Sequence, residues 1–171
     1  MNDLMKPKGG EYNPYYERYV SYTNDQDLKE LLFSQINELE FFLSTKSNNW
    51  FNKPYQVDKW TPKELIGHII DTERIFAYRS LCLARGEQGQ LPGFDENAYV
   101  AAADFNDIHE NILMEDFRTS RMALLSMIRN FHDQAFTRVG MVNGSSMTCR
   151  ACIAIIAGHF IHHMNIMKER Y

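Results

Sequence analysis

Apolar residues recur at alternating three- and four-residue steps in four long segments of the chain. This spacing places them on one face of an α-helix. The segments cover about residues 25–46, 62–85, 108–131 and 149–170, and no series of strand-like segments accompanies them. The pattern predicts an all-α protein: a four-helix bundle in which at least two connections are long loops.

Two of these helices have clear start signals. Thr61 and Glu64 form a capping box around Pro62, which takes the first turn of the second helix. Asn24 and Asp25 are both suitable N-caps for the first helix. These residues predict where both helices begin.

The segment 136–147, before the last helix, contains the pair Asn143-Gly144 between short polar and apolar runs. Asn-Gly favours the tight turn of a β-hairpin. We expect a small hairpin here, followed by a helix that Thr148 caps.

Two irregular stretches accompany the helices. Residues 1–23 form a Tyr-rich N-terminal arm, and this aromatic content indicates a segment that packs on the bundle. The connection 86–107 is long, with a short helix expected at 97–103, and such connections often carry function. We interpret residues 1–171 as a single domain.

The composition narrows the class of protein. The chain has 171 residues, 44% of them hydrophobic, which suits one domain with a large core. The net charge of −4 gives no basic footprint for nucleic acid. No apolar run is long enough to span a bilayer, and the polar N-terminus lacks the apolar centre of a signal peptide. Three cysteines, an odd number, fit reduced thiols. We expect a soluble cytoplasmic protein without membrane or nucleic-acid partners.

Histidines are concentrated in the last predicted helix. At 100° per residue, His159 and His163 point together toward the core, while His162 lies at the edge of the apolar face. Two imidazoles four residues apart can chelate one ion. His68, on the inward face of the second helix, offers a third nitrogen.

Three neutral imidazoles around one divalent ion leave a coordination position open, as catalytic sites do. Nitrogen donors suit Zn or Ni, and also Fe or Mn. Phe160 follows His159 where HExxH metalloproteases carry glutamate, so that class is excluded. The alternative is that these are core histidines, satisfied by backbone carbonyls.

Cys149 and Cys152 form a Cys-x-x-Cys pair at the start of the last helix, where the helix dipole lowers a thiol pKa. No βαβ pattern surrounds the pair, as a thioredoxin-like site requires, and only Cys82 remains for a zinc knuckle. We expect Cys152 to be a small core residue, with a redox role as the alternative.

Three motifs are spread along the chain: WTPKELIGHIIDTE at 60–73, LPGFD at 91–95 and IAGHFIHH at 156–163. In this order and spacing they resemble the DinB-like superfamily of four-helix-bundle proteins, which includes the bacterial YfiT-like proteins. The Tyr-rich segment 11–22 is similar too.

The resemblance implies an up-down-down-up bundle, a metal ion held by His68, His159 and His163, and frequent homodimers. Family members often carry glutamate where this chain has Phe160, which leaves no carboxylate at that position. The superfamily includes transferases that use low-molecular-weight thiols such as bacillithiol, mycothiol or glutathione.

The leading functional hypothesis is a metal-dependent thiol S-transferase that acts on a small electrophile. Asp71, one turn beyond His68, is a candidate to accept its ring N–H or to face solvent. The loop 91–99 would wall the pocket, with Asp95 or Glu96 near its mouth. Alternatives are a metal-dependent hydrolase and a non-catalytic, stress-related metal-binding protein.

Overall fold

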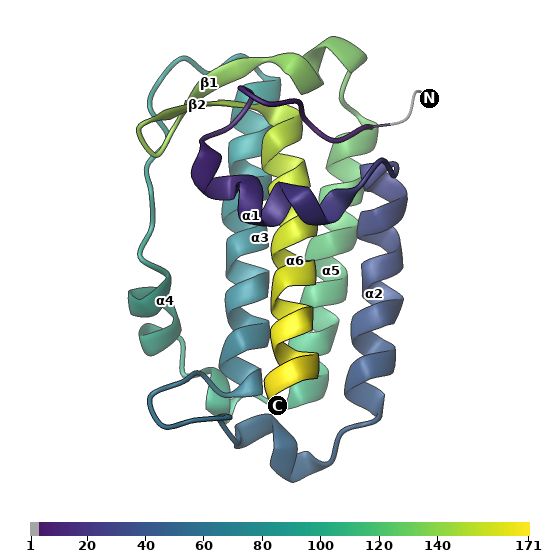
Figure 1. Ribbon diagram of the computed structural model, residues 1–171, viewed down its shortest axis with the longest axis vertical. Helices are drawn as coiled ribbons and strands as arrows, with labels where there is room; N and C mark the ends of the chain where they lie inside the picture. The colour runs from purple at the N-terminus through teal and green to yellow at the C-terminus, as the bar shows by residue number, and fades with distance from the viewer. Residues whose placement is uncertain (1–3) are drawn as a thin grey trace.

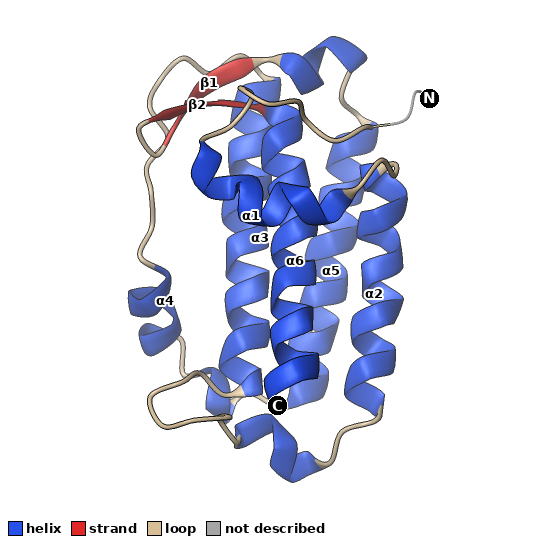
Figure 2. Cartoon of the chain, in the orientation of Figure 1, coloured by secondary structure: helices blue, strands red, loops and turns tan. Residues whose placement is uncertain are grey.

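Four long helices form the body of the protein in the computed structural model, which describes residues 4–171 (Figure 1). They are α2 (Leu28–Ser44), α3 (Pro62–Ala84), α5 (Glu110–Arg129) and α6 (Cys149–Arg170). The short elements are α1 (Glu17–Val20), α4 (Glu96–Ala102), β1 (Val139–Val142) and β2 (Ser145–Thr148) (Figure 2). The predicted all-α four-helix bundle is confirmed.

The helices follow an up-down-down-up order (Figure 1). Helices α3 and α5 lie side by side and run in the same direction, and α2 and α6 run in the opposite direction. Because α3 and α5 are parallel, their connection must return along the whole bundle. That return is the long segment 85–109, which carries α4.

Helix α3 begins as its capping box predicts. The Thr61 side chain accepts a hydrogen bond from the Glu64 amide, and the Glu64 carboxylate accepts one from the Thr61 amide. Helix α2 begins later than expected, because Asp27, not Asn24 or Asp25, caps it. Asn24 has a φ of 47° and ends a preceding 3₁₀ turn, so it is outside the helix.

The predicted hairpin is present at one end of the bundle. Strands β1 and β2 pair antiparallel, and Asn143 and Gly144 make the turn with φ angles of 48° and 75°. Two positive φ angles match the turn type that Asn-Gly favours. Leu91 forms a bridge with Val142, which joins the loop before α4 to the hairpin. Thr148 caps α6 as predicted.

The N-terminal arm crosses the outer face of α6 (Figure 1). Tyr12, Tyr16 and Tyr19 pack against the core. The crossing depends on Gly158, because a Cβ atom there would overlap the main-chain carbonyl of Tyr19. Tyr19 of the arm therefore packs against Gly158, the residue that precedes His159 in α6.

A buried ion pair ties the helices together in the middle of the bundle. Arg121 of α5 donates to the Glu73 carboxylate of α3 at 2.9 Å, to the Leu32 carbonyl at 2.9 Å and to the Gln35 side chain at 2.6 Å. Gln35 of α2 donates in turn to the Ala157 carbonyl of α6. Arg121 and Glu73 are almost fully buried, so each needs the other to offset its desolvation.

Within residues 4–171, no helix combines the length and the apolar character required to cross a bilayer.

Candidate metal centre

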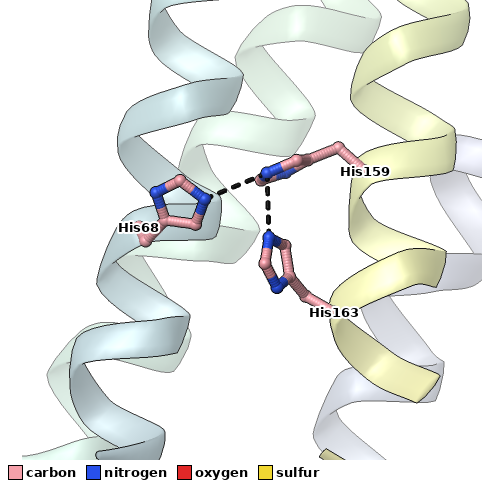
Figure 3. Close-up of side chains that lie close together, drawn as sticks. All are labelled: His68, His159 and His163. Carbon is pink, nitrogen blue, oxygen red and sulfur yellow. Dashed lines mark hydrogen bonds between the residues drawn. The ribbon is translucent and has the colours of Figure 1, made fainter. Parts of the chain in front are cut away.

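Three histidine rings from two helices meet between α3 and α6 (Figure 3). His68 comes from α3, and His159 and His163 come from successive turns of α6. The Nε2 atom of His159 lies 3.0 Å from the Nε2 atoms of both His68 and His163. The structure therefore brings together the three residues that the sequence singled out, and we refer to them as the histidine cluster.

Hydrogen bonding alone does not satisfy the histidine cluster. A neutral imidazole nitrogen offers one in-plane position, either a proton or a lone pair, yet the Nε2 atom of His159 faces two rings. The Nδ1 atom of His163 is buried without a hydrogen-bond partner among the described residues. No backbone carbonyl between residues 4 and 171 accepts a hydrogen bond from these rings, so the arrangement differs from that of ordinary core histidines.

A divalent cation fits this arrangement. Two nitrogens bound tetrahedrally to one zinc ion lie about 3.3 Å apart, close to the 3.0 Å that separates His159 from His68 and from His163. The candidate ligand atoms of the three rings all lie within 4.8 Å of one another. Burial lowers the pKa of His68 to about 4, and it lowers the pKa values of His159 and His163 well below 6.5. Neighbouring histidines add to the effect. The rings are therefore neutral at pH 7, with the lone pairs that a metal ion requires.

Aromatic side chains pack around the cluster. The ring centre of Trp60 lies 4.8 Å from that of His68, and the ring centre of Tyr19 lies 5.2 Å from that of His159. His162 lies half-buried beside Tyr19 and outside the cluster, at the rim of the helix face as predicted. Trp60 and Tyr19 therefore pack directly against two of the three rings.

The histidine cluster opens onto a cavity of about 420 Å³. Its walls are α3, α6, the N-terminal arm, the hairpin turn and the loop before α4. Besides the three histidines it is lined by Asn13, Tyr15, Tyr16, Arg18, Tyr19, Trp60, Thr72, Phe76, Arg79, Phe94, Glu96, Val142, Asn143, Ser145 and Ile155. A small molecule can therefore reach the exposed edge of the cluster.

The family model of the DinB superfamily matches residues 32–167, most of the chain. This chain belongs to the DinB superfamily. No curated protein sequence matches it.

Solved structures share the fold of this chain. YfiT from Bacillus subtilis, a probable metal-dependent hydrolase with an unusual four-helix bundle topology, superposes with a TM-score of 0.72 at 16% identity, over 96% of this chain and 90% of YfiT. The mycothiol-dependent maleylpyruvate isomerase superposes with a TM-score of 0.63 at 15% identity. That match covers 96% of this chain but only 62% of the isomerase. At such identities the likeness establishes the fold alone.

The weak candidate Asp71 does not accept a hydrogen bond from His68 in this DinB protein. Its carboxylate lies 4.0 Å from Arg74 and near Asp116 of α5, and burial raises its pKa. Three residues along a helix turn about 300°, which is about 60° short of a full turn, so Asp71 lies beside the face that carries His68, on the side near Asp116 of α5. In the described chain, no hydrogen bond joins Asp71 to the histidine cluster.

The segment 91–99 forms part of the cavity wall as expected, through Phe94 in the loop before α4 and Glu96 at the start of α4. Asp95 instead caps α4 by accepting hydrogen bonds from the amides of residues 97 and 98. Thr72 and Arg79 also line the cavity, although neither is among the predicted site residues. The helical periodicity of the sequence could have identified both residues, because it places them on the same face of α3 as His68.

The cysteine pair lies in the core of this DinB protein. Cys149 and Cys152 are both free and buried, and the Cys149 thiol donates to the Ser80 carbonyl at 3.4 Å. Burial raises the pKa of Cys149 to about 12 and also raises that of Cys152. Thiols of this kind are poor nucleophiles, in agreement with a structural role.

Proposed function

We propose that this protein is a metal-dependent transferase that joins a low-molecular-weight thiol, such as bacillithiol or glutathione, to a small electrophile. His68, His159 and His163 would hold the metal ion. The observation that carries the proposal is the meeting of three neutral, buried imidazole nitrogens at the wall of a cavity. The likeness of the fold to a mycothiol-dependent enzyme supports the choice of a thiol.

Zn or Ni is the first choice for the ion, with Fe or Mn as alternatives, because three imidazoles are borderline donors. A bound divalent ion lowers the pKa of a thiol or a water molecule at its free position.

The surrounding residues prepare the site for this chemistry. Burial keeps the three rings unprotonated, and the Trp60 and Tyr19 rings hold His68 and His159 in place. In the reaction the thiol loses its proton to solvent and its sulfur forms a bond to the electrophilic carbon. The leaving group departs with the electron pair of the broken bond.

A metal-dependent hydrolase is the second candidate, because the fold also resembles YfiT, a probable metal-dependent hydrolase. In that case the same metal centre and cavity would bind a water molecule in the position of the thiol. The two functions differ in their need for a thiol. The third hypothesis is a non-catalytic, stress-related metal-binding protein.

The experiment is a pair of assays on zinc- and nickel-loaded protein. Glutathione and bacillithiol are offered with an activated aryl halide, and separately a set of activated esters is offered without thiol. Thioether formation that disappears in His159→Ala but persists in His162→Ala supports the transferase. Ester cleavage without thiol supports the hydrolase, and turnover by the metal-free His159→Ala variant contradicts both.

We also propose that the protein is a cytoplasmic homodimer. Three free cysteines fit a reducing compartment. The dimer is carried over from the superfamily resemblance, and light scattering of the purified protein tests it.

A further inference from the structure

Two arginines line the cavity, Arg18 and Arg79, and neither has a role in the mechanism above. Arg18, on the N-terminal arm, is exposed to solvent, so its charge stays hydrated. Arg79 of α3 lines the cavity and is 2% exposed. Across residues 4–171, no aspartate or glutamate forms an ion pair with it. An arginine that is buried without a counter-charge loses its hydration and gains little in return.

The neighbours of Arg79 leave its charge uncompensated. One guanidinium N–H donates to the Pro92 carbonyl at 2.7 Å. The guanidinium carbon lies 4.6 Å from the ring centre of Phe76 and 5.9 Å from that of Phe94. The other groups close to the charge are the Tyr16 hydroxyl and the Cys152 thiol, both neutral because burial raises their pKa values.

Acidic groups of the cavity are placed elsewhere. Glu96 also lines the cavity, but its side chain is exposed and its charge acts on Tyr19 of the arm. Near the hairpin turn the cavity wall is made of neutral hydrogen-bonding groups, including Asn143 and Ser145. The inner part of the cavity therefore combines a fixed positive charge with neutral polar groups.

Arg79 and His68 lie on one line along α3. They are eleven positions apart, which places their Cα atoms about 20° apart around the helix and about 16 Å apart along it. Thr72 and Phe76 occupy the intervening turns and line the same cavity. The Thr72 hydroxyl is buried without a hydrogen-bond partner among the described residues. One cavity is therefore lined along α3 from the histidine cluster to Arg79.

We infer that Arg79 binds an anionic group, a carboxylate or a phosphate, of an elongated ligand whose other end reaches the histidine cluster. A bidentate guanidinium–anion contact would supply the missing counter-charge. The identity of the group at the histidine end rests on the proposed function. The binding of an anion by Arg79 does not depend on the proposed function. The anionic group belongs either to the thiol or to the electrophile.

The test is a calorimetric comparison of ligands that differ only in one terminal group. Octanoate and 1-octanol are titrated into metal-free and zinc-loaded protein, so that the result does not depend on the metal. The expected result is at least a tenfold tighter binding of octanoate. Equal affinities in the wild-type protein would overturn the inference without any variant.

Variants then assign the preference to one residue. Arg79→Gln should abolish the preference, and Arg79→Lys should keep part of it because the charge remains. Arg74→Gln, which removes an exposed arginine of the same helix, is the matched control and should keep all of it. A preference for octanoate that persists in folded Arg79→Gln would contradict the assignment.

A second pair of ligands distinguishes the two sources of the anion. With zinc-loaded protein, 8-mercaptooctanoate should bind more tightly than 8-mercapto-1-octanol if the thiol carries the anionic group. If the electrophile carries the anionic group, the affinity for octanoate should be the same with and without 2-mercaptoethanol bound at the metal. Each result should be lost in Arg79→Gln, and a result that persists in that variant contradicts an anion at Arg79.

Discussion

The main-chain carbonyl of Tyr19 lies directly against Gly158 on α6, with no room between them for a methyl group. The Tyr19 ring in turn packs on His159, the next residue of α6. A single glycine therefore couples the position of the N-terminal arm to one wall of the histidine cluster.

Gly158→Ala should displace the arm. Helix propensity alone would make alanine the more stable residue by about 1 kcal/mol, whereas overpacking costs about 1–3 kcal/mol. We expect net destabilisation in chemical denaturation, together with faster proteolysis within residues 11–23. Unchanged or increased stability with a protected arm would show that the contact is not tight.

Arg121→Met should destabilise the bundle by about 3–5 kcal/mol, because Glu73 would be left as a buried charge without its partner. The double variant Arg121→Met with Glu73→Leu should recover much of this loss, since it removes both charges. Urea unfolding of the single and double variants measures the coupling. Additive losses in the double variant would contradict the buried pair.

The stability of the metal-free protein should depend on pH through the histidine cluster. Burial lowers the folded-state pKa values of all three rings, that of His68 to about 4, while the unfolded chain keeps values near 6.5. Below pH 6.5 the unfolded state therefore binds more protons than the folded state, and stability falls as the pH falls.

The expected slope is up to about 1.4 kcal/mol per pH unit for each histidine. Urea unfolding of metal-free protein between pH 7.5 and pH 5 measures it. His68→Gln should reduce the slope, and His132→Gln, at an exposed position, should leave it unchanged. A stability that is flat over this range would argue against neutral buried rings.

The three thiols should differ in reactivity. Cys149 and Cys152 are fully buried with raised pKa values, whereas Cys82 is partly exposed. Mass spectrometry after brief iodoacetamide treatment should find Cys82 alkylated in native protein and all three only after unfolding. Rapid native labelling of Cys149 would revive a redox role for the pair.

Much of the architecture could be predicted from local chemistry. The Thr61 capping box, the Asn143-Gly144 turn and the 3.6-residue periodicity are short-range signals, and the structure confirms each of them. The predicted start of α2 at Asn24 or Asp25 is too early, because a 3₁₀ turn ends at Asn24 and Asp27 caps the helix.

The candidate site could be predicted only in part. Helix angles brought His159 and His163 to one face, and His68 was found because it lies on the inward face of another helix. The burial of Arg79 in the cavity depends on the arm, the hairpin turn and the loop before α4. These contacts join segments far apart in the sequence, and no short-range sequence pattern predicts them.

The most direct test of the metal centre is elemental analysis of protein purified without a histidine tag, in wild-type, His163→Ala and His162→Ala forms. We predict near-stoichiometric metal in the wild type and in His162→Ala, and its loss in His163→Ala. Wild-type protein that holds no metal after incubation with Zn, Ni, Mn and Fe(II) would contradict the account.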